Sequence, residues 1–313
     1  MTIASQHSSG DILADRRADY ARMLAEGGDF SGAAELMEQA LEISPGWAAG
    51  WFRLAEYAEK AGSVPIAAAA LGRVLELAPE DPFGAGLRLA VLGAADVPAT
   101  PPTRYVEQLF DDYAQRFDTA LVEKLDYSVP QKLAALVADG ISSERFAHVT
   151  DLGCGTGLFG ERIRARADFL EGFDLSANML AKAREKRVYD RLAQADLSLP
   201  PSESGVFEAD LTPGRADLAS AADVLMYLGE LTPVFAIAFR LIAPRGHFAF
   251  SVEDAGAEET YVLRSSLRYA HAETYVRQRA EQGGFDLLQS RQTVIRMDAG
   301  APVTGRLYLA QRR

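Results

Sequence analysis

The chain has 313 residues, of which 48% are hydrophobic, and a formal net charge of −12 from 32 basic and 44 acidic residues. A length above one typical domain and this apolar content predict two globular domains with cores of their own. The negative charge repels phosphate backbones and anionic lipid surfaces, so we expect neither a nucleic-acid nor a membrane partner. Signal-peptide features and apolar runs of ~18 residues are missing from the sequence, which makes the cytoplasm the expected location.

Residues 14–96 are predicted to form helical repeats. Gly28 recurs as Gly62 and Pro45 recurs as Pro79, a spacing of 62 − 28 = 34 residues. This is the length of the tetratricopeptide repeat (TPR), in which two helices pair and a proline closes the second one. We therefore expect an all-α TPR region at the start of the chain.

A last helix over 83–92 is expected to cap these repeats. Two repeats and a cap fall at the short end of what such a stack needs, so we expect the region to contact the next domain or a second copy. The proline-rich stretch 97–103 has little to bury and is predicted to be a linker. A second domain then spans 104–313.

Helices and strands alternate in this second domain. The sequence predicts helices over 104–120, 130–138, 159–167 and 177–186, and strands over 147–152, 169–174, 217–220, 247–252, 285–293 and 305–311. The polar segment 198–213 is expected to be a loop. Alternating helices and strands predict a Rossmann-like α/β fold, with a mostly parallel sheet, helices on both faces and ligands at the carboxyl ends of the strands.

Three alternating glycines, Gly153, Gly155 and Gly157, follow the strand predicted at 147–152. Glycine tolerates positive φ and has no Cβ, so a strand can turn sharply into a helix and leave room for a ligand against the backbone. Read from Gly155, the motif also satisfies GxGxxG, and by itself it fits both S-adenosylmethionine and NAD. Cys154, the only cysteine, lies between the glycines as an expected space-filler, and neither a disulfide nor a metal site is expected.

Acidic residues at the strand ends favour one of these cofactors. Asp174 ends the second strand, 174 − 153 = 21 residues after Gly153, where a carboxylate can bind both ribose hydroxyls of either cofactor. Asp196 could accept the adenine amino group. The structural alternatives are a helix N-cap for Asp174, although Ser176 is better placed, and a solvated loop position for Asp196. Together with Asp151, these acids suit a cationic sulfonium and ammonium ligand and suit a pyrophosphate badly.

With these motifs and the run AADVLMYL at 221–228, the chain from about residue 104 resembles a class I S-adenosylmethionine-dependent methyltransferase of the bacterial type with an N-terminal TPR region. The resemblance implies that S-adenosylmethionine is the cofactor and S-adenosylhomocysteine the product. It also implies that the glycine loop holds the methionine portion, Asp174 the ribose and Asp196 the adenine. The expected cofactor contacts are Asp151, Gly153, Gly155, Gly157, Asp174, Leu175, Met179, Asp196, Ala222, Tyr113 and Phe117.

The helix predicted at 104–120 carries Phe110, Tyr113 and Phe117 on one face. The resemblance implies that this helix folds over the cofactor as a lid. The same spacing fits an ordinary core face, and both alternatives stay open. The interval from Asp196 to the next strand is longer than the family pattern, which leaves the adenine wall undefined.

Methyl transfer from a sulfonium needs mainly a positioned nucleophile, so a dedicated base is optional. The candidates for a base are Asp223, Tyr227, Glu253 and His271. Each also has a structural interpretation: Asp223 as a helix-start acid, Tyr227 as half-buried packing, Glu253 as a surface-loop residue, and His271 as a helix-capping or exposed residue. The chain lacks the Asn-Pro-Pro-aromatic signature of many amino-group methyltransferases.

Three functions follow from the sequence. The favoured one is a methyltransferase acting on a small molecule or a protein, with the TPR region binding a partner or a second copy. An NAD-dependent oxidoreductase is supported only by the overlapping GxGxxG pattern. The third is a TPR scaffold whose methyltransferase fold is inactive.

Overall fold

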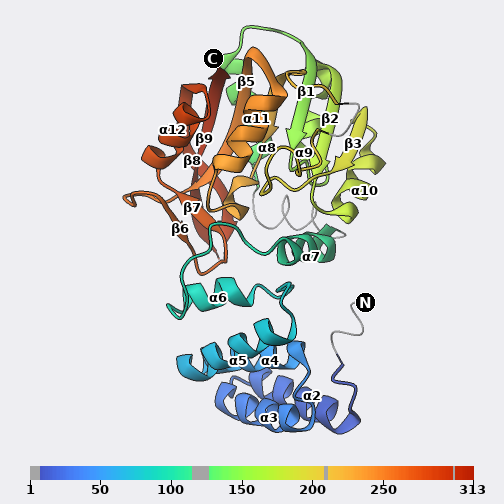
Figure 1. Ribbon diagram of the computed structural model, residues 1–313, viewed down its shortest axis with the longest axis vertical. Helices are drawn as coiled ribbons and strands as arrows, with labels where there is room; N and C mark the ends of the chain where they lie inside the picture. The colour runs from blue at the N-terminus through green and yellow to red at the C-terminus, as the bar shows by residue number, and fades with distance from the viewer. Residues whose placement is uncertain (1–7, 115–126, 208–210, 299) are drawn as a thin grey trace. The chain divides into compact units, whose positions relative to one another are not determined.

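The computed structural model describes residues 8–114, 127–207, 211–298 and 300–313 (Figure 1). The chain divides into two compact units, 1–98 and 99–313, and the division falls inside the predicted linker. Among the described residues, no helix has the length and apolar content needed to cross a membrane.

The first unit consists of paired helices. They are α2 (Ile12–Glu26), α3 (Phe30–Ile43), α4 (Ala48–Lys60), α5 (Val64–Leu77) and the short α6 (Ala85–Val91). Small side chains let the helices approach closely, since Ala33, Ala55 and Ala67 are fully buried beside Leu54 and Leu71. This is the predicted pattern of two helix pairs and a last helix.

Side-chain caps define where these helices begin. The carboxylate of Asp11 accepts the amides of Leu13 and Ala14 at the start of α2. Before α6 the buried Asp81 accepts the amides of Ala85 and Gly86 at 2.7 and 2.9 Å. Such bonds satisfy the free N–H groups of a first helical turn.

In the described part of the second unit, the strands form one nine-stranded sheet. Its strands are β1 (Phe146–Leu152), β2 (Ala167–Asp174), β3 (Arg191–Gln194), β4 (Ala216–Ala221), β5 (Ile242–Asp254), β6 (Tyr261–Leu263), β7 (Tyr269–His271), β8 (Phe285–Asp298) and β9 (Ala301–Arg312). Strands β3-β2-β1-β4-β5 are parallel neighbours in that order. Strand β9 pairs antiparallel with β5 and with β8. The mostly parallel sheet is therefore confirmed.

Helices cover both faces of this sheet (Figure 1). They are α8 (Val129–Gly140), α9 (Leu158–Ile163), α10 (Ala177–Lys186), α11 (Thr232–Leu241) and α12 (Glu273–Gln282). Helix α7 (Thr103–Tyr113) lies at the carboxyl ends of the strands. Phe248 and Phe250 of β5 pack into the core that includes residues of α11 and α12. Ala249 between them packs into the other core, with residues of α8 and α9. The two-residue alternation of a strand thus divides the apolar residues between two cores.

Several boundaries differ from the prediction. The helix expected over 159–167 ends at Ile163, because a 3-10 turn (Arg164–Arg166) leads into β2. Strand β5 is 13 residues long instead of six. The strand end expected at Asp196, for which no bounds were predicted, is that of β3, whereas α11, α12 and the hairpin of β6 and β7 were not predicted. The helix expected over 104–120 is α7 as far as Tyr113, and residues 115–120 lie outside the described part of the chain.

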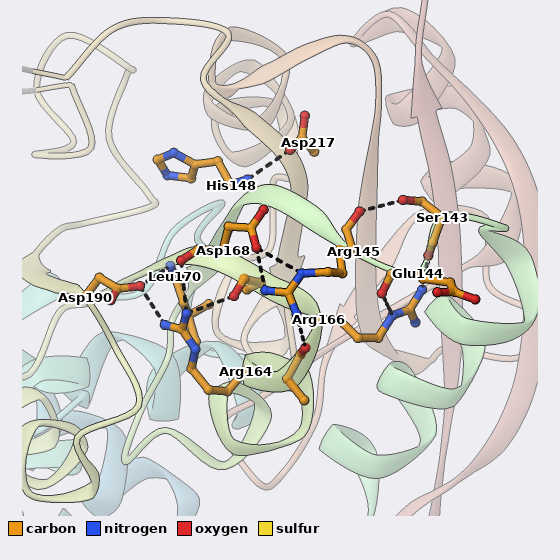
Figure 2. A network of polar contacts seen from close by, with 12 residues as sticks. Ser143, Glu144, Arg145, His148, Arg164, Arg166, Asp168, Leu170, Asp190 and Asp217 are labelled. Carbon is orange, nitrogen blue, oxygen red and sulfur yellow. Dashed lines mark hydrogen bonds and ion pairs between the residues drawn. The ribbon is translucent and has the colours of Figure 1, made fainter.

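Arginines tie together the segments that lead into β1 and β2 (Figure 2). Arg145 donates to Asp168, and Arg164 bonds Asp190 at 2.6 Å as well as the carbonyls of Ala167 and Asp168. Arg166 bonds the carbonyl of Ser143. This network lies at the amino ends of the strands and leaves their carboxyl ends for the candidate site.

Candidate functional site

A cavity of about 370 Å³ opens at the carboxyl ends of the strands. It is lined by the loop after β1, the ends of β2, β3 and β4, helix α7, the turn of the β6–β7 hairpin and β8. This volume falls in the range of small-molecule sites. Of the predicted site residues, Asp151, Gly153, Gly155, Asp174, Leu175, Asp196, Ala222, Tyr113, Asp223 and Tyr227 line it.

The glycine loop turns away from β1 through left-handed backbone. Gly153, Gly155 and Gly157 have φ of +70°, +53° and +93°. Gly153 and Gly155 line the cavity, whereas Gly157 is buried and precedes α9 as its N-cap. A Cβ on Gly157 would lie 3.0 Å from the ring of Tyr189. Gly157 thus packs the loop against Tyr189, and its expected role at the cofactor stays a prediction.

Asp174 is fixed at the end of β2 before any ligand binds. Its Oδ2 accepts the N–H of Gly155 at 2.8 Å, and its Oδ1 accepts the N–H of Ser176 at 2.9 Å. Burial raises the pKa of Asp174 to about 6, although these two backbone bonds oppose the shift. Ser176 caps α10 by accepting the amide of Met179, so the N-cap alternative does not apply to Asp174.

Asp196 follows β3 and belongs to the same wall of the cavity. One of its carboxylate oxygens accepts the N–H and hydroxyl of Ser198, and the other accepts the hydroxyl of Thr103 at 3.0 Å. Leu175 and Leu197 also line this part. Residues 196–198 and the start of α7 thus form this side of the cavity, and the adenine role expected for Asp196 stays a prediction.

Asp151 is buried and bonded between neighbouring strands. It accepts the hydroxyl of Tyr189 at 2.7 Å and that of Ser220 at 2.8 Å. Burial raises its pKa to about 6, with these bonds opposing the shift. Sequence reasoning missed Tyr189, because a tyrosine between α10 and β3 matches no motif.

Helix α7 covers part of the cavity. Val106, Phe110 and Tyr113 line it, and the ring of Phe110 lies edge-on to that of Tyr227 at 4.9 Å between centroids. Phe117 lies outside the described residues. The predicted lid face therefore borders the cavity as far as Tyr113, and whether it moves stays a prediction.

Met179, a predicted cofactor contact, packs behind the cavity, whereas Cys154 lines it. Met179 is fully buried in α10 and does not line the cavity, because the first turn of that helix points it into the protein. Cys154 is buried, and burial raises the pKa of its thiol well above the ordinary value. A thiol that stays protonated fits the expected space-filler.

Asp223 and Tyr227, two of the four candidate bases, line the cavity. Asp223 adopts a left-handed φ of +61°, which non-glycine residues rarely do, and its N–H donates to the hydroxyl of Ser251. Burial raises its pKa to about 6, and the guanidinium of Arg296, 3.3 Å away, opposes that shift. Asp223 is therefore one partner of a buried ion pair.

Glu253 and His271 do not line the cavity. Glu253 is buried in β5 and forms an ion pair with Arg296, so the surface-loop interpretation is wrong. His271 is 1% exposed at the end of β7, where its Nε2 lies 2.8 Å from the carbonyl of Leu228. The helix-capping and exposed interpretations are therefore wrong, because the missed hairpin buries this residue. Burial lowers the pKa of His271 to about 4.

Arg268 and Arg296 line the cavity and were missed by the sequence analysis. Arg296 lies in the part of β8 beyond its predicted end, and Arg268 lies in the turn of the unpredicted hairpin. Arg268 could have been found from the run RYAH at 268–271, because it lies three residues before His271, the one residue of this run that was taken as a candidate.

Comparisons with known proteins agree with this architecture. Residues 150–248 match a family model described as a methyltransferase domain, and residues 24–89 match one described as a tetratricopeptide repeat. A malonyl-[acyl-carrier protein] O-methyltransferase of Salmonella typhimurium is 26% identical over 155 residues, which are 49% of this chain and 58% of that protein. A ubiquinone biosynthesis O-methyltransferase of Thiobacillus denitrificans is 30% identical over 37% of this chain and 47% of that protein. The chain thus spans about half the length of these relatives.

Solved structures share the fold. The 1,6-didemethyltoxoflavin-N1-methyltransferase of Burkholderia thailandensis, with bound 1,6-didemethyltoxoflavin and S-adenosylhomocysteine, aligns over 70% of this chain and 93% of its own, with a TM-score of 0.51 and 19% identity. A Haloferax volcanii putative methyltransferase, in complex with the Trm112 activator, aligns over 64% of this chain and 96% of its own, with a TM-score of 0.51 and 15% identity. The predicted Rossmann-like methyltransferase fold is confirmed.

Proposed function

We propose that this chain, in which a methyltransferase domain follows a tetratricopeptide repeat region, transfers the methyl group of S-adenosylmethionine to a small-molecule or protein acceptor. The observation that carries the proposal is the pairing of the glycine loop with Asp174 and Asp196 along one wall of a single cavity.

The residues of this wall fit the chemical groups of the cofactor. Gly153 and Gly155 leave main-chain atoms facing the cavity without a Cβ, as close contact with the methionine portion requires. Asp174 uses each carboxylate oxygen for one backbone bond, which leaves a lone pair on each oxygen for a ribose hydroxyl. In this proposal, Asp196 receives the adenine amino group and Leu197 packs against the ring.

The bound cofactor supplies a sulfonium methyl group that is already activated for displacement. The protein then has to bind and orient the two reactants, which can account for much of the catalysis. Helix α7 supports the exclusion of water, because Val106, Phe110 and Tyr113 cover the cavity with apolar surface. Asp223, Tyr227 and Arg268 belong to the acceptor side in this proposal.

The two relatives matched in sequence are O-methyltransferases, which favours an oxygen acceptor here as well. The N1-methyltransferase matched in structure, at 19% identity, shares the fold alone. The repeats are proposed to bind a protein partner or a second copy, as helical repeats commonly do. A cytoplasmic location completes the proposal.

Calorimetric titration with S-adenosylhomocysteine and with NADH tests the cofactor. We expect S-adenosylhomocysteine to bind at one site in the second unit and NADH not to bind. Substitution of Asp223 by Asn serves as a matched control for Asp174→Asn, since both carboxylates line the cavity but only Asp174 is assigned to the ribose. Binding of NADH in place of S-adenosylhomocysteine would refute the proposal.

A further inference from the structure

The turn between β6 and β7 brings Arg268 to the cavity. Strand β7 pairs in parallel with the last residues of β5, so the hairpin lies at the carboxyl end of the sheet (Figure 1). Leu267, directly before Arg268, has a φ of +60°, a left-handed conformation that is unfavourable for a residue with a side chain. Backbone strain of this kind tends to occur where a fold fixes the direction of a functional residue.

Arg268 has only part of its hydrogen-bonding capacity used. Its Nε donates to the hydroxyl of Tyr227 at 3.3 Å, and its Nη1 lies 3.3 Å from a carboxylate oxygen of Asp298. Within the described ranges, no hydrogen bond or ion pair involves Nη2. Burial opposes the charge on Arg268, but Tyr227, Glu253 and Asp223 outweigh it and raise its pKa. The cavity therefore holds a permanent cation, the guanidinium of Arg268, whose Nη2 can donate hydrogen bonds to a ligand.

The second arginine of the cavity is already neutralised. Arg296 is 3% exposed, and its two terminal nitrogens pair with Asp223 and Glu253. Two carboxylates around one guanidinium leave no positive charge for a ligand. Arg268, whose acidic partner Asp298 is about half exposed, is thus the cation that a ligand can reach.

The possible bases near Arg268 are engaged elsewhere. Asp223 is held by Arg296, Glu253 does not line the cavity, and the imidazole of His271 is directed to the carbonyl of Leu228. Tyr227 accepts a bond from the Arg268 guanidinium. Among the described residues, this part of the cavity therefore offers no free base for a neutral hydroxyl or amine. An acceptor suited to it arrives already deprotonated.

We propose that the methyl acceptor is a small carboxylic acid whose carboxylate is bound by Arg268, a proposal that rests on the methyltransferase function above. Arg268 and the hydroxyl of Tyr227 bind one carboxylate oxygen, and the other attacks the sulfonium methyl carbon. The oxygen–carbon bond forms as the carbon–sulfur bond breaks, and the electron pair of that bond stays on sulfur. The products are a methyl ester and a neutral thioether, and no proton is transferred.

The charge around Arg268 favours a monoanion. A carboxylate matches one guanidinium in charge and can form charge-assisted bonds with it. A phosphate or sulfate dianion would carry a second negative charge close to Asp223 and Asp298, with Arg296 already paired. Inorganic sulfate therefore serves as the probe that separates a carboxylate site from a general anion site.

Calorimetric titration of monomethyl malonate, a monoanion, into the full chain, with and without saturating S-adenosylhomocysteine, tests the inference. We expect monomethyl malonate to bind and the neutral dimethyl malonate and sulfate to bind at least tenfold more weakly. Arg268→Gln should weaken the binding of monomethyl malonate at least tenfold and change the affinity for S-adenosylhomocysteine less than twofold. The matched control is Arg264→Gln, an exposed arginine of the same turn, which should leave both affinities unchanged.

The outcomes separate this inference from the proposed function. Failure of S-adenosylhomocysteine to bind would refute the methyltransferase, whether or not monomethyl malonate binds. Binding of S-adenosylhomocysteine with no binding of monomethyl malonate, with equal binding of sulfate or the diester, or with full affinity for monomethyl malonate in Arg268→Gln would overturn the carboxylate site alone. Arg268→Lys, which keeps the charge but loses the planar fork, should recover part of the affinity for monomethyl malonate.

Discussion

The backbone N–H of Gly155 donates a 2.8 Å hydrogen bond to Oδ2 of Asp174, and this bond joins the glycine loop to the end of the neighbouring strand. Left-handed backbone at Gly155 presents that N–H to the carboxylate. The proposed ribose-binding group is thus held in place by the motif itself. Preorganisation of this kind lowers the entropy lost when a ligand binds.

Replacing Asp174 by Asn should weaken S-adenosylhomocysteine binding by more than ~1 kcal/mol, because charge-assisted bonds to the ribose are lost. Burial raises the pKa of Asp174 to about 6, so its carboxyl group is protonated in the free protein below about pH 6. Since the ionised carboxylate is the binding form, affinity should rise as pH increases from 5 to 7 and then level off.

Calorimetry between pH 5 and 8 checks this pH dependence. The difference in affinity for S-adenosylhomocysteine between the unmodified protein and Asp174→Asn should rise with pH and have its midpoint near pH 6. Below that pH, the unmodified protein should release protons when the ligand binds. Asp286→Asn, at an exposed surface ion pair, is the control and should follow the unmodified protein. Identical pH profiles for the unmodified protein and Asp174→Asn would rule out the ribose role.

Gly153→Ala should destabilise the second unit through two separable effects. The φ of +70° costs a Cβ-bearing residue ~1–2 kcal/mol, and the new Cβ would overlap the side chain of Val224, which adds about 1–3 kcal/mol. Gly214→Ala is the matched control, with a φ of +67° and open space around the Cβ. Adding Val224→Ala to the Gly153→Ala variant should restore part of the lost stability, because it removes the side chain that the new Cβ overlaps.

Urea unfolding followed by far-UV circular dichroism measures these differences. Both tryptophans, Trp47 and Trp51, lie in the first unit, so their fluorescence reports that unit separately. If Gly153→Ala lowers the free energy of unfolding no more than Gly214→Ala does, the side chain of Val224 moves aside without a measurable loss of stability.

The sequence predicted those parts of the site that local chemistry determines. Alternating glycines and an acid at the end of a strand are fixed by backbone geometry, so Gly155 and Asp174 were found in their places. Arg268 and Arg296 were missed because their positions depend on pairing between distant segments. His271 was misplaced for the same reason, since only the hairpin shows that it is buried.

Arg296→Met should destabilise the second unit by about 3–5 kcal/mol at pH 7, because Asp223 and Glu253 would be left as buried unpaired charges. The loss should shrink at pH 5, where Asp223, whose pKa burial already raises to about 6, is protonated. Arg291→Met, an exposed arginine of the same strand, is the control and should change stability by less than ~1 kcal/mol. A loss independent of pH would contradict this charge assignment.

A buried network around Glu171 should make the second unit sensitive to acid. The carboxylate of Glu171, which is fully buried in β2, accepts bonds from Thr150 at 2.7 Å and Arg215 at 2.8 Å, and His148 Nε2 lies 3.1 Å away. Burial alone would raise the pKa of Glu171, but these three partners outweigh it and lower the pKa. The stability from this network is therefore present above the ordinary glutamate pKa and is lost as pH falls through the lowered value.

Glu171→Gln should accordingly cost about 3 kcal/mol at pH 7, because it leaves the buried Arg215 without its anion. The difference should narrow at pH 4, below the ordinary glutamate pKa of 4.5, because the unfolded chain then takes up a proton that the folded protein, with its lowered pKa, holds less readily. Glu161→Gln, at the partly exposed pair with Lys186, should cost less than ~1 kcal/mol at either pH. Urea unfolding at the two pH values measures the change, and an equal loss at both would mean that Glu171 acts through shape and not through its charge.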